Sequence, residues 1–261
     1  MLRLFFILTL ITSLSGCLHS NKIAPIDNTY SARSQSSRID TIVIHYTASE
    51  LTPSLEILTK GEVSAHYLIP PDGKKIYQLV DEQRRAWHAG DSQWNGRRWL
   101  NATSIGIELV HPGYIETTQG RQWPAYSDAQ ISALIELLKD LQTRHAITPR
   151  NIVGHSDIAP QRKVDPGPAF PWPRLADAGL IRWPSTTGLQ SAYTQLNNNV
   201  PPALWFQQQL ARLGYAIAQT GQWDENSRVV LAAFQMKYRP ERFDGQPDIT
   251  SAALLLALNE P

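Results

Sequence analysis

Cysteine is almost absent from this sequence, in which Cys17 is the single one among 261 residues. The chain therefore has no disulfide of its own and no set of thiolates with which to bind a metal. An excess of charge of one sign is also lacking, since 24 lysines and arginines face 23 aspartates and glutamates, for a formal net charge of +1. Because there is no basic run either, we expect no binding to nucleic acid.

Long apolar runs are scarce as well. The run at residues 4–11 is too short to span a bilayer, and it leads to Leu14-Ser15-Gly16-Cys17. This order is typical of a secretory signal peptide over residues 1–16. Its end resembles a bacterial lipobox, after which Cys17 becomes the lipidated first residue; an ordinary signal peptide with an unrelated cysteine is the alternative. The polar residues 17–37 are expected to form a flexible tether.

Two short apolar runs each end in a histidine. Residues 42–44 are all β-branched, which is the pattern of a central strand buried on both faces, and His45 follows them directly. Residues 151–154 lead to His155 in the same way. Two such strands in one sheet would place both imidazoles at one edge of that sheet.

A lysine and a carboxylate follow the second histidine closely. Pro166 favours an extended backbone at Asp165, and Lys163 lies two residues before the aspartate, on the same side of an extended segment. Imidazole and carboxylate groups are both good ligands for zinc. The sequence therefore predicts a metal site made by His155 and Asp165, with His45 as the best candidate for a third ligand. Lys163 would lie near whatever the metal binds.

An acidic residue interrupts a third apolar segment. In residues 104–110, the side chains of Ile105, Ile107 and Leu109 share one face of an expected strand, whereas Glu108 lies on the other face. A carboxylate in the middle of an apolar strand is unfavourable unless it is paired or functional. Glu108 is therefore a candidate acid or base, with a structural ion pair as the alternative.

These residues belong to longer segments that resemble the zinc-dependent N-acetylmuramoyl-L-alanine amidases, a family related to phage amidases and peptidoglycan recognition proteins. Within that family the chain is similar to the AmiD-type outer-membrane lipoproteins. The segments are IVIHYTA, SAHYLIPPDGKKIYQLVDE, AWHAG, NATSIGIELV and GHSDIAPQRKVDPGPAFPW. The resemblance implies an α/β fold with a central mixed β-sheet flanked by helices.

The resemblance also implies roles for individual residues. His45, His155 and Asp165 would bind Zn²⁺, and Glu108 and Lys163 would be the catalytic pair. Phage-type relatives have a cysteine as the third ligand, and this chain departs from them at Asp165. No nucleotide or organic cofactor is indicated.

Three further residues are candidates for contact with a substrate, namely Tyr46, His88 and Asn101. Aromatic and amide side chains that lie close together suit the recognition of sugars and peptides. Surface packing is the alternative for the loop that holds Asn101, and support of that loop is the alternative for His88.

The activity implied by the resemblance is hydrolysis of the amide bond between N-acetylmuramic acid and L-alanine of the peptidoglycan stem peptide. Whether anhydro-muramic acid is also accepted stays open. One alternative is a lipoprotein that binds peptidoglycan without cleaving it, and another is a zinc peptidase that cuts within the stem peptide. A non-catalytic member would lack a metal ligand, whereas all three ligand positions are filled here.

The chain is expected to contain two folded parts. We assign residues 38–183 to the zinc amidase domain, residues 184–201 to a linker, and residues 202–261 to a small domain that resembles a three-helix peptidoglycan-binding module. Within the first domain, Ser127 and the apolar stripe that follows it predict a helix over residues 128–144.

The residue after the cysteine bears on location. It is Leu18 rather than an aspartate, which by resemblance to lipoprotein sorting favours the outer membrane. We expect a monomer that is anchored there by its lipid and faces the periplasm of a Gram-negative bacterium, with peptidoglycan and muropeptides as its partners.

Overall fold

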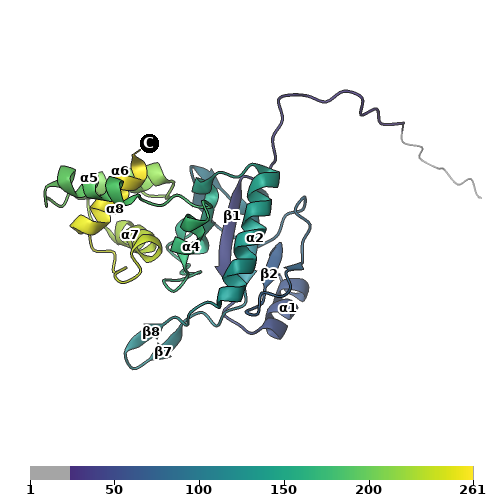
Figure 1. Ribbon diagram of the computed structural model, residues 1–261, viewed down its shortest axis with the longest axis horizontal. Coiled ribbons are helices and arrows are strands. Elements are labelled where there is room, and N and C mark those ends of the chain that lie inside the picture. The colour runs from purple at the N-terminus through teal and green to yellow at the C-terminus, as the bar shows by residue number, and fades with distance from the viewer. Residues whose placement is uncertain (1–23, 261) are drawn as a thin grey trace, which may run out of the picture. The chain divides into compact units, whose positions relative to one another are not determined.

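The computed structural model describes residues 24–260. The chain divides into two units, Met1–Gln35 and Ser36–Pro261. In the first unit, the described residues 24–35 contain no helix or strand. The predicted signal peptide and Cys17 lie outside the described residues. All elements below belong to the second unit and are labelled in Figure 1 where there is room.

A mixed sheet of five strands forms the centre of the second unit, in the order β3-β2-β6-β1-β9. Strands β2, β6, β1 and β9 run parallel, and β3 pairs with β2 in the antiparallel sense at the edge. This confirms the α/β fold with a central mixed sheet that the sequence predicts. The strands are β1 (Thr41–Tyr46), β2 (Tyr67–Ile69), β3 (Tyr77–Gln78), β6 (Ser104–Leu109) and β9 (Ile152–Gly154).

Shorter elements surround the sheet. Two small hairpins are formed by β4 (Gln93–Trp94) with β5 (Arg97–Arg98) and by β7 (Ile115–Thr117) with β8 (Gly120–Gln122). The helices are α1 (Leu51–Lys60), α2 (Asp128–His145), α3 (His155–Ile158), α4 (Trp172–Asp177), α5 (Thr186–Leu196), α6 (Ala203–Leu213), α7 (Glu225–Tyr238) and α8 (Ile249–Asn259). Between residues 24 and 260, no helix has both the length and the hydropathy needed to cross a membrane.

Helix α2 covers one face of the sheet and lies alongside β1 in Figure 1. It begins where the sequence predicts, because Ser127 Oγ accepts a hydrogen bond from Gln130 N at 3.1 Å. The Gln130 amide then donates to Ile69 O and Val110 O at 2.8 and 3.0 Å, which ties the helix to the sheet. The apolar side chains of this layer form one buried cluster that includes Ile42, Ile44, Ile105, Ile107, Ile131, Leu134 and Leu138.

On the opposite face of the sheet, Leu68 packs in one buried cluster with α1, and a separate buried cluster includes the C-terminal helices. Because side chains alternate along a strand, Val43 points away from the side of α2. Val43 and Val153 belong to a second buried cluster, together with Phe206 and Leu210 of α6 and Phe234 of α7. Figure 1 shows these helices on the other side of β1 from α2. The C-terminal helices and the sheet therefore share a hydrophobic core.

The segment over residues 184–201 corrects the sequence prediction of a linker. Thr186–Leu196 form helix α5, which begins where Ser185 Oγ accepts from Gly188 N at 3.0 Å. Ala192 is fully buried, and α5 packs against α8. The polar composition conceals this helix because most of its side chains face solvent. The three helices predicted in residues 202–261 are confirmed as α6 to α8.

Candidate active site

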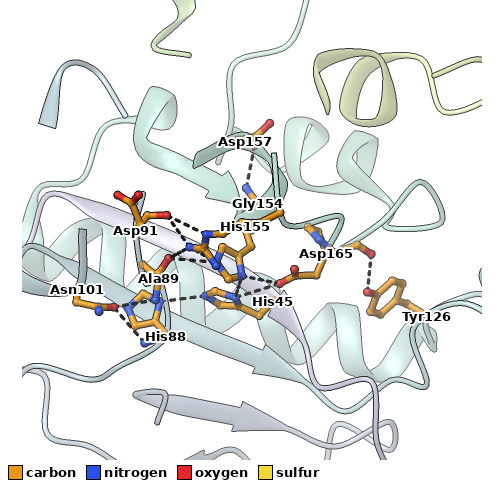
Figure 2. A network of polar contacts seen from close by, with 12 residues as sticks. His45, His88, Ala89, Asp91, Asn101, Tyr126, Gly154, His155, Asp157 and Asp165 are labelled. Atoms are coloured by element: carbon orange, nitrogen blue, oxygen red, sulfur yellow. Dashed lines mark hydrogen bonds and ion pairs between the residues drawn. The ribbon is translucent and has the colours of Figure 1, made fainter. Parts of the chain in front are cut away.

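The three predicted metal ligands meet at one end of the sheet, as Figure 2 shows. His45 is near the end of β1, His155 is the first residue of α3 directly after β9, and Asp165 lies in the loop that follows. His45 Nδ1 lies 2.9 Å from His155 Nδ1 and 3.1 Å from Asp165 Oδ2, and His155 Nδ1 lies 3.0 Å from the same Oδ2. All three side chains are buried.

The hydrogen bond behind His155 fixes its tautomer. Its Nε2 lies 3.2 Å from the carbonyl oxygen of Ala89. A carbonyl oxygen only accepts, so Nε2 carries the proton and donates it. In the neutral form that a metal ligand needs, an imidazole has only one protonated nitrogen, so His155 Nδ1 would present a lone pair towards Asp165.

A longer chain of hydrogen bonds fixes His45 in the same form. Ser104 Oγ donates its single proton to Leu100 O at 2.6 Å and therefore accepts from His88 Nε2 at 3.2 Å. Since its Nε2 is protonated, the neutral His88 accepts at Nδ1 from His45 Nε2, which lies 3.0 Å away. His45 Nδ1 therefore carries no proton and presents a second lone pair.

The buried surroundings shift the pKa values of these groups. Burial and the neighbouring His155 lower the pKa of His45 to about 4. Burial, together with His45, lowers the pKa of His88 well below its ordinary value. Burial would raise the pKa of Asp165, but its interactions with His155 and His45 outweigh this effect and lower the pKa below its usual range. At neutral pH these shifts favour a neutral His45, a neutral His88 and an ionised Asp165.

Three proton-free acceptor atoms at such short separations fit a divalent cation. With metal–ligand bonds of about 2.0–2.1 Å in tetrahedral geometry, the ligand atoms around zinc lie roughly 3.3 Å apart. The observed separations of 2.9 to 3.1 Å are close to that spacing. Metal ligation also requires histidine in its neutral form, and the hydrogen bonds behind both imidazoles then leave Nδ1 as the free nitrogen that faces the site.

The ligands open into a cavity of about 320 Å³, and Glu108 and Lys163 line it beside them. Glu108 pairs with His45 in the register of β1 and β6. Its Oε2 is buried, and among the described residues it has no hydrogen-bond partner and no ion pair. Burial, with the charge of Asp165 as a smaller cause, raises the pKa of Glu108 to about 8. This environment favours a functional carboxylate over the structural ion pair that was the alternative.

The predicted substrate contacts occupy different positions. Tyr46 and His88 line the cavity. Asn101 Oδ1 instead accepts from His88 N at 3.0 Å and from Ala89 N at 2.7 Å, as Figure 2 shows. Asn101 thus holds the loop whose carbonyl and imidazole groups orient both histidine ligands. This position favours loop support for Asn101 over substrate contact.

The sequence alone did not indicate several other residues of the site. Ser104 and the Ala89 carbonyl orient the ligands, and Arg162 lines the cavity and donates to Asp91 O at 2.6 Å. One local signal was present in Gly106, because a Cβ there would lie 2.4 Å from Cγ of His88. Glycine inside a strand often marks such a close approach.

Comparison with known proteins gives this geometry a family. A family model described as N-acetylmuramoyl-L-alanine amidase matches residues 35–168, which include all three ligands, Glu108 and Lys163. The chain belongs to this family. A second family model, for a peptidoglycan binding domain, matches residues 200–255.

Relatives of the family resemble the chain over different lengths. N-acetylmuramoyl-L-alanine amidase AmiD of Escherichia coli is 40% identical over 272 residues, covering 100% of this chain and 98% of AmiD. The 1,6-anhydro-N-acetylmuramyl-L-alanine amidase AmpD of Citrobacter freundii is 46% identical over 113 residues, covering 43% of this chain and 55% of AmpD.

Two solved structures share the fold over most of the chain. That of E. coli AmiD, in complex with the substrate anhydro-N-acetylmuramic acid-L-Ala-D-gamma-Glu-L-Lys, has a TM-score of 0.83 at 40% identity and covers 89% of this chain and 93% of its own. AmpDh3 of Pseudomonas aeruginosa has a TM-score of 0.85 at 39% identity and covers 91% of this chain and 98% of its own. AmpDh3 has also been solved with an anhydromuramic pentapeptide.

The orienting role of His88 can be measured through metal affinity. We expect His88→Phe to weaken Zn²⁺ binding about 10- to 100-fold, because His45 loses the acceptor that fixes its tautomer. Competition with a chromophoric chelator measures the affinity. His145→Phe is a matched control, because His145 at the end of α2 forms its hydrogen bonds with Glu82, Ser37 and Arg144 and with none of the predicted ligands. Equal affinities in the two variants would remove His88 from this role.

The raised pKa of Glu108 predicts how stability depends on pH in metal-free protein. Between the ordinary value of 4.5 and the folded value of about 8, the folded state keeps a proton that the unfolded state has released. The contribution of Glu108 to the free energy of unfolding therefore falls as pH rises through this window. Glu108→Gln lacks this titration.

We expect urea unfolding in the presence of a chelator to show Glu108→Gln gaining stability relative to the unaltered protein between about pH 5 and about pH 8. Titration of the histidines is common to both proteins and cancels in the difference. Parallel stability profiles for the two proteins would contradict the raised pKa.

Proposed function

We propose that the protein is a zinc-dependent N-acetylmuramoyl-L-alanine amidase. It hydrolyses the amide bond between the lactyl group of N-acetylmuramic acid, or of its anhydro form, and L-alanine of the stem peptide. The observation that carries the proposal is the buried triangle of His45, His155 and Asp165 next to an unpaired carboxylate in an open cavity. The amidase activities for which AmiD and AmpD are named support the choice of bond.

His45, His155 and Asp165 would hold the zinc ion. Two nitrogen ligands and one carboxylate oxygen suit this metal, and three protein ligands are typical of catalytic rather than structural zinc sites. When bound, zinc polarises carbonyl groups and lowers the pKa of a bound water to about 7. The ligand charges sum to one negative charge, so the centre keeps a net positive charge.

Glu108 acts as the general base and then as the general acid. Its unpaired Oε2 takes a proton from the attacking water and later returns it to the leaving amine of L-alanine. A pKa of about 8 in the absence of a cation means that Glu108 holds a proton readily. A nearby divalent cation would lower that value towards neutrality, where a group that both accepts and donates a proton is most effective.

Lys163 stabilises the charge that develops on the carbonyl oxygen of the scissile amide. Its side chain is half-buried and lines the same cavity as Glu108. A cation that is partly removed from water contributes more to a transition state than the same charge would in bulk solvent.

Defined muropeptides test this proposal. We expect the purified protein to release intact stem peptide and a lactyl-ended sugar, as identified by mass spectrometry. Glu108→Gln should reduce turnover by at least about 100-fold while the protein still binds zinc, because the proton carrier is lost and the ligands remain. Glu116→Gln is the matched control, since Glu116 is an exposed acid in β7.

The products separate the amidase from the alternatives. Shortened peptides that are still joined to the sugar would indicate a peptidase. Binding of muropeptides without any product, in protein loaded with zinc, would indicate a receptor.

We further propose that the mature chain is a monomeric lipoprotein of the outer membrane that faces the periplasm of a Gram-negative bacterium. The support is the order of the apolar run, Leu14-Ser15-Gly16-Cys17 and Leu18. Acyl chains on Cys17 would contribute about 0.8 kcal/mol per buried methylene, so more than one chain gives stable attachment.

Cys17→Ser tests the anchor. We expect cells expressing this variant to incorporate no labelled fatty acid into the protein, because the chain has no other cysteine to modify. Its activity on soluble muropeptides should be unchanged, since the catalytic residues are untouched. Continued fatty-acid labelling of the variant would contradict the proposed lipobox.

A further inference from the structure

We infer that Lys237 and Tyr215, which belong to the C-terminal helical region, are positioning residues for the metal ligand His155 and act through Asp157. The helical region is defined here as α5 to α8 with their connecting segments. The inference rests on the proposed metal site, and it does not depend on which bond the protein cleaves.

Asp157 is where the two parts of the fold meet beside the metal site. Its Oδ2 accepts from Gly154 N at 2.8 Å, a bond that Figure 2 shows, so the carboxylate holds the backbone directly before the ligand His155. The same Oδ2 accepts from Lys237 Nζ at 2.9 Å. The other oxygen, Oδ1, accepts from Tyr215 OH at 2.6 Å. Both oxygens of this carboxylate therefore accept hydrogen bonds, and two of the three donors belong to the helical region.

The backbone on both sides of His155 depends on these bonds. Gly154 N is held by the Asp157 side chain, and Ser156 N donates to Asp165 O at 2.9 Å. Helix α3 has a single turn, so its own hydrogen bonds supply little rigidity. Two contacts therefore set the direction of the His155 imidazole. The Asp157 side chain holds the backbone before His155, and the backbone of Asp165 holds it after His155.

Burial makes the contact with Lys237 consequential. Asp157 is 1% exposed, Lys237 is 6% exposed and Tyr215 is 4% exposed. A carboxylate removed from water needs an opposite charge, and removing one partner of a buried pair leaves the other uncompensated. Without the lysine, the Asp157 carboxylate should therefore rotate towards water or towards other hydrogen-bond donors. The turn that carries His155 would move with the carboxylate.

Aromatic packing fixes the lysine in place. Lys237 Nζ lies 4.1 Å from the ring centroid of Trp172 in α4. The Trp172 indole also lies against the backbone before His155, since a Cβ added at Gly154 would be 3.3 Å from its Cζ2. Tyr215 packs edge-on against Trp94, with ring centroids 5.0 Å apart. Both polar groups of the helical region reach Asp157 from rigid surroundings.

The competing explanation is that Lys237 and Tyr215 only stabilise the packing of the helical region on the rest of the fold. Metal affinity distinguishes the two explanations. We expect Lys237→Met, and to a smaller extent Tyr215→Phe, to weaken Zn²⁺ binding about 10-fold or more in chelator competition, as is typical when support of a ligand is lost. Turnover number should fall more than the Michaelis constant changes, because the cavity that receives the substrate is not altered.

Arg150→Met is the matched control. Arg150 Nη2 donates to Arg212 O at 2.7 Å, so this variant also replaces a cation that joins the segment before β9 to the helical region, but this cation forms no hydrogen bond with Asp157. Its zinc affinity should equal that of the unaltered protein. Rescue provides a further check: Asp157→Asn in the Lys237→Met background removes the uncompensated charge and keeps an acceptor for Gly154 N, so zinc affinity should partly recover.

Equal zinc affinities for Lys237→Met and Arg150→Met would overturn the inference. If Lys237→Met does not fold, Tyr215→Phe decides alone, because it removes a single hydroxyl group, and unchanged affinity in that variant would overturn the inference as well. Products formed by the unaltered protein decide the proposed function separately. A chain that cleaves no amide but loses zinc affinity in these variants would keep the inference and refute the amidase.

Discussion

Three acceptor atoms without a proton, His45 Nδ1, His155 Nδ1 and Asp165 Oδ2, face one another at 2.9 to 3.1 Å, and the surrounding structure is built to hold them there. Lone pairs at that distance repel unless a cation lies among them. The protein must therefore fix each group from behind. Backbone carbonyl oxygens do this, directly for His155 and through Ser104 and His88 for His45. Because carbonyl oxygens cannot donate, the direction of every bond in both chains is determined.

Strand β6 contributes to the site in three ways through one face. Ser104, Gly106 and Glu108 alternate along the strand and so lie on the same side. The serine ends the hydrogen-bond chain to His45, the glycine leaves space for the His88 ring, and the glutamate faces the cavity. The other face carries the isoleucines that pack against α2. A single strand thus joins the hydrophobic core to the proposed chemistry, which places Glu108 rigidly beside the ligands.

The C-terminal helices share a hydrophobic core with the sheet and are not a separate appended module. Their family model is that of a peptidoglycan binding domain, yet Phe206 and Phe234 share a core with Val43 of the sheet. Lys237 and Tyr215 then reach the turn that begins at His155. An accessory module that is joined only by a tether could not supply these contacts, because both its apolar face and its buried charge would be exposed to water.

The sequence alone predicted the candidate ligands and the candidate acid, which the structure brings to one cavity, and it determined the strands near them and the helix that covers the sheet. Residue type, alternation with a period of two and helical periodicity are local properties that a sequence displays directly. Tertiary structure alone decided the tautomers, the place of Asn101 and the pairing of Asp157 with Lys237 80 residues away. It also decided that residues 186–196 are a helix, since burial of Ala192 against α8 outweighs a polar composition. Hydrogen bonds and packing between distant segments produce no periodic pattern in the sequence, because they depend on which segments the fold brings together.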